Sequence, residues 1–180
     1  MQPQRLLCLD VSSTCVGYAC FVSGVLDDFG KYQPPARKPA EERIRMIVKG
    51  IMDGTKAFVP DVVVMEWTDG RGDGTRARQR GGKTAGLAVL GQAQGAVRAA
   101  IQIGGFTVET VHEFEWSAGR KKDVRASELA LEFPTYCALA SLGRDQGYDI
   151  ADAIGIGLWW LGKQKIERLL EPSAPTPKGG

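Results

Sequence analysis

Histidine and cysteine are scarce in this sequence. It contains one histidine, His112, and four cysteines, namely Cys8, Cys15, Cys20 and Cys137. No two of the cysteines form a Cys-x-x-Cys pair, and a structural zinc site needs four nitrogen or sulfur ligands. A zinc site is therefore not expected. Cys8 and Cys20 lie in apolar runs, so we expect them to be small buried residues with reduced thiols, as is usual in cytosolic proteins.

Long apolar runs and a strong charge imbalance are also absent. No run approaches the roughly 18 residues that span a membrane, and the N-terminus lacks the pattern of a signal peptide. We therefore expect a cytoplasmic protein that does not engage a membrane. The net charge is only +2, so charge alone does not indicate a nucleic-acid partner.

The length and composition indicate one domain. The 180 residues, 43% of them apolar, are enough for a single compact core. We predict a domain over residues 1–171. Residues 172–180 are rich in proline and glycine, so we predict a disordered tail there.

Basic residues gather in two short segments. The first lies in a glycine- and arginine-rich stretch over residues 67–82, which has almost no aliphatic residue and is predicted to be a surface loop. Its basic residues, with the lysine that follows, are Arg71, Arg76, Arg78, Arg80 and Lys83. The second segment surrounds Asp123 and contains Arg120, Lys121, Lys122 and Arg125. Such local clusters favour phosphate binding even at low net charge.

The apolar periodicity predicts an α/β fold with a five-stranded mixed sheet flanked by helices. Strands are expected over residues 6–11, 16–22, 29–32, 62–65 and 106–111. Helices are expected over residues 41–58, 83–104, 125–131 and 149–170. The first three strands should form a meander, with Asp27 and Asp28 in the turn before the third. The last two strands should be added by helical crossovers.

Four carboxylates carry the strongest chemical signal. Asp10 and Glu66 each end a buried apolar strand, and parallel neighbouring strands would bring both to one edge of the sheet. Asp149 and Asp152 have the i, i+3 spacing that places them on one helical face. An all-oxygen set suits Mg²⁺ or Mn²⁺. Alternatively, Asp149 is a helix N-cap, Asp152 complements the helix dipole, and Asp10 caps the turn over residues 12–14.

Four ordered segments resemble the RuvC family of Holliday junction resolvases, which have a ribonuclease H-like fold. LCLDVSSTCVGYA over residues 7–19 resembles the family's first strand, turn and second strand. VVVME over 62–66 resembles its fourth strand, LGQAQG over 90–95 the following helix, and DIADA over 149–153 the start of the last helix. The loop arginines are compatible with a phage relative.

The resemblance implies a crossover junction endodeoxyribonuclease that cuts four-way DNA by two-metal phosphodiester hydrolysis. Asp10, Glu66, Asp149 and Asp152 would be the ligands of two Mg²⁺ ions, with Mn²⁺ as a substitute. Lys122 would act beside the scissile phosphate, or else be part of a solvated surface pair with Lys121. The helix over residues 83–104, rich in small residues, would form a homodimer interface, or its glycines would pack within the chain.

The resemblance also suggests DNA contacts and one departure. An aromatic residue follows the catalytic glutamate in the family, so Trp67 would stack on bases at the junction centre, or else cap the core edge. The expected DNA contacts are Trp67, Arg71, Arg76, Arg78, Arg80, Lys83, Arg120 and Lys121. The family usually has a further lysine after the fifth strand, where this chain has EFEW over residues 113–116. Arg120 or Lys121 is the candidate to replace it.

Three alternative functions share some of these features. Another ribonuclease H-like nuclease would cut flaps or RNA–DNA hybrids. A non-catalytic junction-binding module would keep the basic loop but would not need four converging carboxylates. Sugar-kinase and actin-like ATPases begin with a similar strand and turn, but they have a second, duplicated domain for which 180 residues leave no room.

Overall fold

A computed structural model describes residues 4–68 and 84–170. The strands are β1 (Arg5–Val11), β2 (Val16–Val22), β3 (Val25–Tyr32), β4 (Val62–Glu66) and β5 (Val108–Val111). The helices are α1 (Ala40–Phe58), α3 (Thr84–Ile103), α4 (Glu113–Ser117), α5 (Lys122–Glu132), α6 (Pro134–Ser141) and α7 (Asp149–Leu170). None of the helices in these ranges is long and apolar enough to cross a membrane. Arg71, Arg76, Arg78, Arg80, Lys83 and the predicted tail lie outside the described residues.

The five strands form one mixed sheet in the order β3-β2-β1-β4-β5. β1, β2 and β3 are joined as an antiparallel meander, while β4 pairs in parallel with both β1 and β5. The parallel pairs need crossover connections, and α1 and α3 provide them. The predicted meander with two helical crossovers is therefore confirmed.

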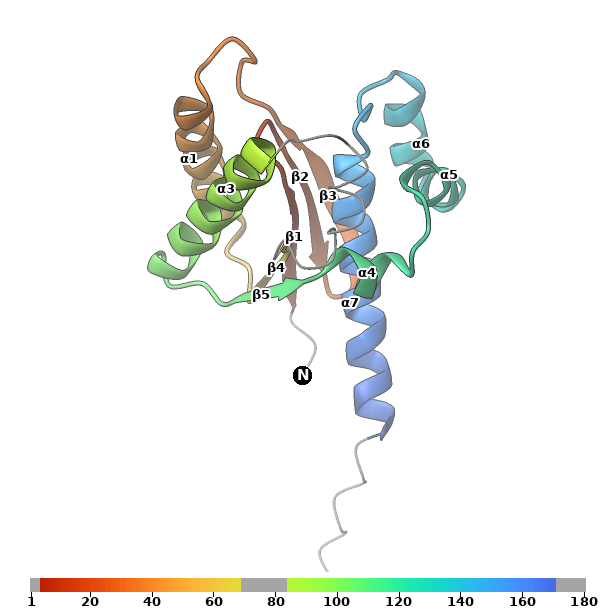
Figure 1. The fold of residues 1–180 in the computed structure, drawn as a ribbon. Coiled ribbons are helices and arrows are strands. Elements are labelled where there is room, and N and C mark those ends of the chain that lie inside the picture. The colour runs from red at the N-terminus through yellow and green to blue at the C-terminus, as the bar shows by residue number, and fades with distance from the viewer. Residues whose placement is uncertain (1–3, 69–83, 171–180) are drawn as a thin grey trace, which may run out of the picture.

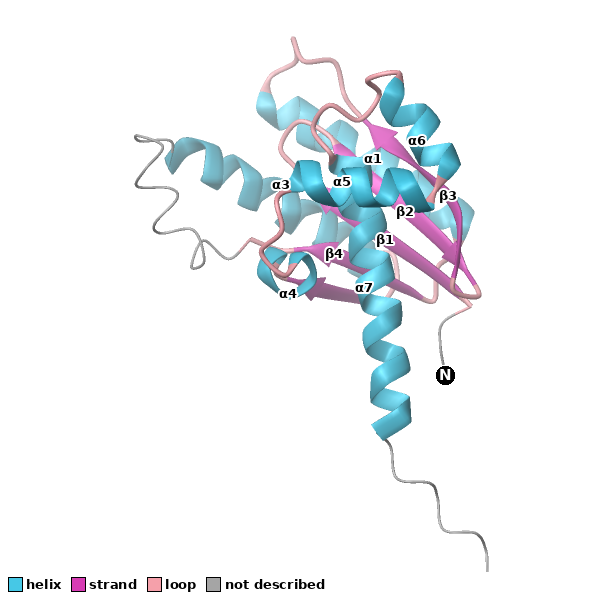
Figure 2. Cartoon of the chain, turned by 90° about the vertical axis from the view of Figure 1, so that its right-hand side faces the viewer, coloured by secondary structure: helices cyan, strands magenta, loops and turns pink. Residues whose placement is uncertain are grey.

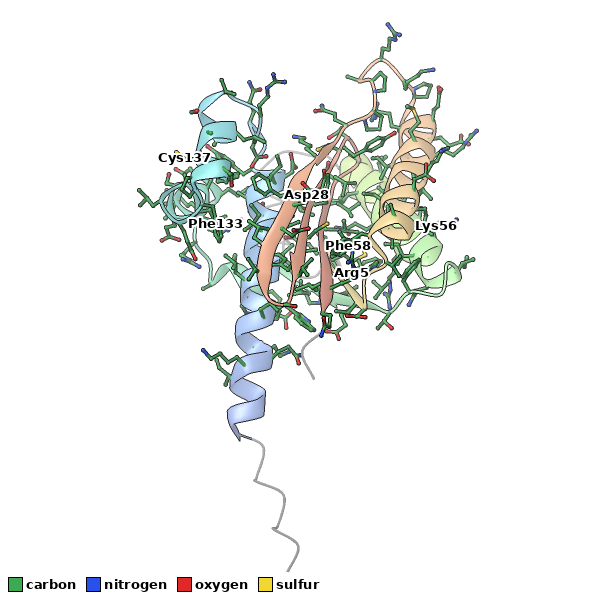
Figure 3. The ribbon with its side chains drawn as sticks, turned by 180° about the vertical axis from the view of Figure 1, so that it is seen from behind. Arg5, Asp28, Lys56, Phe58, Phe133 and Cys137 are labelled. Carbon is green, nitrogen blue, oxygen red and sulfur yellow. The ribbon has the colours of Figure 1, made fainter. Side chains whose placement is uncertain are left out.

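Helices cover both faces of the sheet (Figure 1). Side chains alternate between the two faces along a strand, so Leu7 and Leu9 of β1 join the core under α1 and α3, whereas Leu6 and Cys8 join the core under α7. The start of β1 also contacts the end of α1, where the Arg5 guanidinium lies 4.4 Å from the centre of the Phe58 ring (Figure 3). The sheet is thus buried on both sides, which explains the nearly unbroken apolar runs in β1 and β4.

Helix α7 crosses the sheet closely over β1 and β2 (Figure 2). A Cβ atom at Gly157 of α7 would lie 2.2 Å from the Phe21 ring and 3.0 Å from the Cys8 sulfur. Only glycine therefore permits this contact. Cys8 and Cys20 are buried and unpaired, as predicted.

Some predicted boundaries were wrong. β3 begins at Val25, and the turn before it is formed by Ser23 and Gly24, which both have positive φ angles. Asp27 and Asp28 lie inside β3 because this edge strand is half exposed and tolerates polar residues. Helix α5 begins at Lys122, three residues earlier than predicted, and the short helices α4 and α6 were not predicted. Helices of one or two turns give too little apolar periodicity to be recognised.

Candidate functional site

The ends of β1 and β4 meet at one edge of the sheet. The two strands are parallel, with Leu9 opposite Met65, so Asp10 and Glu66 follow at the same level. Both occupy alternate positions that face α7, because Cys8 and Val64, two residues earlier, belong to the core under that helix. The prediction that these two strands are parallel neighbours is confirmed, and Asp10 and Glu66 lie at the same edge of the sheet.

The first turn of α7 approaches this edge directly. Gly17 of β2 pairs with Asp10, and a Cβ atom at Gly17 would lie 1.9 Å from the Asp149 carbonyl oxygen. The missing side chain therefore makes room for the helix start. Asp149 and Asp152 both lie in this first turn, and both are buried.

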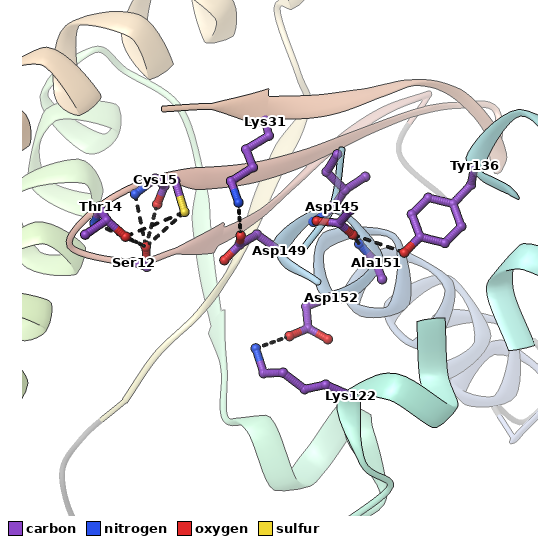
Figure 4. Close-up of polar contacts among 11 residues, drawn as sticks. Ser12, Thr14, Cys15, Lys31, Lys122, Tyr136, Asp145, Asp149, Ala151 and Asp152 are labelled. Atoms are coloured by element: carbon purple, nitrogen blue, oxygen red, sulfur yellow. Dashed lines mark hydrogen bonds and ion pairs between the residues drawn. The ribbon is translucent and has the colours of Figure 1, made fainter. Parts of the chain in front are cut away.

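Asp145, which the sequence analysis did not single out, holds the N-terminus of α7 (Figure 4). Its carboxylate accepts hydrogen bonds from the backbone N–H groups of Ile150 at 3.1 Å and Ala151 at 3.0 Å, and from the Tyr136 hydroxyl at 3.0 Å. Asp145 therefore caps the N-terminus of α7. The alternative reading of Asp149 as the N-cap was wrong, and its carboxylate instead forms a contact with β3.

The turn between β1 and β2 is stabilised by its own serine. The Ser12 hydroxyl oxygen accepts the backbone N–H groups of Thr14 at 3.2 Å and Cys15 at 3.0 Å, and it donates to the Cys15 carbonyl at 3.0 Å (Figure 4). The alternative in which Asp10 caps this turn was therefore wrong. Within residues 4–68 and 84–170, no group donates a hydrogen bond to the Asp10 carboxylate or forms an ion pair with it.

Burial and mutual repulsion shape the charges of the cluster. The pKa of Asp10 is raised well above its ordinary value, first by burial and then by the negative charge of Glu66. Asp152 and Asp149 raise it further, and Lys122 opposes them. Burial likewise raises the pKa of Glu66 to about 7, with Asp152 contributing repulsion. Asp10 therefore lies within electrostatic range of the other three predicted carboxylates.

Two lysines neutralise part of this charge. Lys122 of α5, a predicted site residue, forms an ion pair with Asp152, and Lys31 of β3 forms one with Asp149 (Figure 4). Burial acts to lower the pKa of Lys122, but the charges of Asp10 and Asp152 outweigh it and raise the pKa. Lys31 was missed because only the strand register reveals it. It pairs with Gly17, which in turn pairs with Asp10, so all three form one row across the sheet.

The donor set fits a hard divalent cation. Asp10, Glu66, Asp149 and Asp152 offer only carboxylate oxygens, the ligands that Mg²⁺ and Mn²⁺ prefer. A buried carboxylate without a donor, such as Asp10, is costly unless a cation meets it. As placed in the described part of the chain, no three acidic, histidine or cysteine side chains already have metal-binding geometry. These four residues would hold the metal, and Lys31 and Lys122 would then release their ion pairs with Asp149 and Asp152.

Two further side chains contact the cluster from the segments after β5. The indole N–H of Trp116, in α4, donates to Glu66 Oε2 at 3.1 Å. Arg125 Nη2, in α5, donates to Asp152 Oδ1 at 2.8 Å, and its guanidinium lies 4.5 Å from the centre of the Trp116 ring. Arg125 belongs to the basic segment that was expected to favour phosphate binding, but its side chain is only 5% exposed.

Gln94 of α3 joins the ends of the two central strands. Its buried side-chain amide donates to the carbonyl groups of Val11 at 3.4 Å and Glu66 at 3.3 Å, and its oxygen accepts the Thr68 N–H at 3.1 Å. It lies in the LGQAQG segment quoted for the family resemblance. Its physical role is to fix β1 against β4 where the two carboxylates emerge.

The predicted DNA contacts that the structure describes, Trp67, Arg120 and Lys121, lie outside the cluster. Lys121 and Arg120 are exposed, and Arg120 pairs with Glu128 at 2.6 Å. Trp67 packs half-buried against the core under α1 and α3, on the opposite face of the sheet from Glu66. The Arg98 guanidinium lies 5.4 Å from the centre of its ring. The role of these residues in DNA binding stays a prediction.

The sheet order and the flanking helices define a ribonuclease H-like fold, as predicted, and solved structures share it. Thermus thermophilus RuvC in complex with a Holliday junction superposes with a TM-score of 0.62 at 18% identity, covering 91% of this chain and 96% of that chain. The yeast mitochondrial Holliday junction resolvase gives 0.65 at 12% identity, covering 93% and 81%. The fowlpox virus resolvase, solved with Holliday junction DNA, gives 0.53 at 14% identity, covering 93% and 99%. No protein-family model and no curated protein sequence matches the chain.

Proposed function

We propose that this chain is a magnesium-dependent endonuclease that resolves four-way DNA junctions as a homodimer. The observation that carries the proposal is the parallel register of β1 and β4, which brings Asp10 and Glu66 together beneath the first turn of α7. The fold is the one found in structures of Holliday junction resolvases bound to their DNA. Carboxylates arranged in this way on this fold support phosphodiester hydrolysis.

We expect the carboxylates to bind the metal ions and a lysine to contact the DNA phosphate. Asp10, Glu66, Asp149 and Asp152 would hold two Mg²⁺ ions, with Mn²⁺ as a substitute. When bound, such ions activate water and neutralise the charge that develops on the leaving oxygen. Lys122 has a side chain that is 47% exposed at the edge of the cluster, so it can meet a DNA phosphate from the solvent side and stabilise its charge.

The outer face of α3 supports a homodimer. Ala93, Val97 and Ile101 bury the inner face of this helix. On the other side of the helix, no described atom lies within 4 Å of a Cβ built at Gly91 or Gly95 beyond each glycine's immediate chain surroundings. Packing within the described chain therefore does not explain these glycines, whereas close contact with a second copy would. A two-fold dimer suits a four-way junction, which needs two cuts.

The proposal is tested by cleavage of matched synthetic substrates with Mg²⁺. We expect paired nicks in a four-way junction, little cutting of linear duplex, and loss of cutting in Asp10→Asn with junction binding retained. Equal or better cutting of forks, flaps or RNA–DNA hybrids would instead identify another ribonuclease H-like nuclease. Junction binding without cutting would identify a non-catalytic module, and ATP hydrolysis without cutting would identify an ATPase.

A further inference from the structure

Trp116 and Arg125 connect two of the four carboxylates through side chains that do not belong to the cluster itself. Trp116 donates to Glu66, Arg125 donates to Asp152, and the guanidinium stacks on the indole ring. The two carboxylates come from β4 and α7, which lie far apart in sequence. The chain of contacts Glu66–Trp116–Arg125–Asp152 is therefore continuous across the site.

Each contact leaves one carboxylate oxygen for other partners. Trp116 binds Oε2 of Glu66, and none of the described residues donates a hydrogen bond to Oε1. Arg125 binds Oδ1 of Asp152, so Oδ2 is the oxygen that faces Lys122. A carboxylate with one oxygen fixed in this way has its plane and direction set before any cation arrives.

The surroundings of both side chains favour fixed positions. Trp116 is 4% exposed, and a Cβ atom at Gly155 of α7 would lie 2.9 Å from its ring, so the glycine makes room for the indole. Arg125 also donates through Nη1 to the Arg120 carbonyl oxygen. A guanidinium this deeply buried cannot reach a DNA phosphate, so its positive charge acts inside the protein.

We propose that Trp116 and Arg125 form one positioning unit that orients Glu66 and Asp152 to receive a divalent cation. The inference deepens the proposed function and rests on it, since it assumes that these carboxylates bind metal. It also gives a role to the segment after β5, where the chain has EFEW instead of a lysine. Because the guanidinium stacks on the indole, a change at one residue should alter the contact made by the other.

The test measures Mn²⁺ binding to the DNA-free protein by electron paramagnetic resonance. Trp116→Phe keeps a ring and removes the N–H, and Arg125→Lys keeps the charge and removes the planar fork. We expect each variant to bind Mn²⁺ about 10- to 100-fold more weakly than wild type, as is typical when the partners of metal ligands are lost. The double variant should lose less than the product of the two single losses, because the residues act as one unit.

Trp160→Phe is the matched control, since it also removes an indole N–H to carboxylate bond, here to Glu109 at 2.8 Å and remote from the cluster. It should keep wild-type Mn²⁺ affinity even where its melting temperature falls. Wild-type affinity in Trp116→Phe and Arg125→Lys, alongside lost binding in Asp10→Asn, would overturn the positioning unit alone. Unchanged binding in Asp10→Asn, or no binding by the wild type, would overturn the metal site of the proposed function and the inference with it.

Discussion

Gly17 and Asp149 are in such close contact that a Cβ atom at Gly17 would lie 1.9 Å from the Asp149 carbonyl oxygen. Gly17 also pairs with Asp10 in the sheet. The glycine therefore sets how closely the carboxylates of α7 approach those of the strands. Any side chain here must push the start of α7 away from β2.

We expect Gly17→Ala to lower the free energy of unfolding by about 1–3 kcal/mol, the usual cost of overpacking, and to reduce cleavage more than junction binding. Chemical denaturation and single-turnover cleavage would measure the two effects. Gly54→Ala is the control, because nothing lies within 4 Å of a Cβ at this exposed position of α1. That variant should be as stable as wild type or slightly more so. Normal stability and cleavage in Gly17→Ala would contradict the packing described here.

The metal-free protein should lose stability as the pH rises from about 5 to 8. Burial raises the pKa of Glu66 to about 7 in the folded protein, against about 4.3 in an unfolded chain. The folded state therefore favours the protonated acid, and this contribution is fully present below the unfolded pKa and is lost as the pH rises through the folded pKa. Asp10 has a shift in the same direction.

Melting temperatures measured across this range in a chelating buffer would show the effect. Glu66→Gln should be less sensitive to pH than wild type, while Glu128→Gln, at an exposed surface pair, should follow the wild-type curve. Mg²⁺ should restore stability at pH 8, because a ligand that binds only the folded state stabilises it. An identical pH profile in wild type and Glu66→Gln would show that this carboxylate is not perturbed.

The proposed dimer predicts that a bulky side chain on the outer face of α3 disrupts association. Gly91→Phe should sediment as a monomer at micromolar concentration, whereas Gly54→Phe, at an exposed position on α1, should sediment as wild type does. Far-ultraviolet circular dichroism would establish that both variants are folded. If the wild type is itself a monomer, both alone and with junction DNA, α3 is not a dimer interface.

Substitutions at Trp67 distinguish its two interpretations, which are stacking on DNA bases and packing at the edge of the core. Its half-buried ring packs against the α1 and α3 core, so we expect Trp67→Ala to lower the free energy of unfolding by about 1–3 kcal/mol, below the cost for a fully buried tryptophan. Trp67→Leu should restore much of that stability. If the ring also stacks on unpaired bases, Trp67→Leu should lose junction cleavage far more than duplex affinity. Equal effects on both DNA substrates would leave packing as its function.

The sequence predicted the carboxylate cluster because its parts have strong local signals. β1 and β4 are nearly unbroken apolar runs with an acid at the last or next-to-last position, and the spacing of Asp149 and Asp152 places both in one helical turn. Because successive side chains along a strand point to opposite faces, the position of each acid in its strand then determines the face on which it lies. These features depend only on neighbours in the sequence and on one parallel pairing.

The partners of the cluster could not be predicted in the same way. Lys31 reaches Asp149 only through the register of an edge strand, and Arg125 reaches Asp152 only through the tertiary packing of α5 against α7. Trp116 lies in a helix of five residues that has no clear apolar pattern. Asp145 lies in an irregular segment before α7, where an acid has no distinguishing spacing.

Gln94 connects helix α3, the proposed dimer interface, to the strand ends that carry the carboxylates. Its amide holds the carbonyl groups at the ends of β1 and β4, while Gly91 and Gly95, three residues before it and one residue after it, lie on the adjoining surface of the same helix. If two copies meet through those glycines, the same turn of α3 carries both the subunit contact and the hydrogen bonds to the catalytic edge. The distance between the two incisions would then be fixed by rigid secondary structure, and a displacement of α3 in one subunit would disturb the symmetry with which both strands are cut.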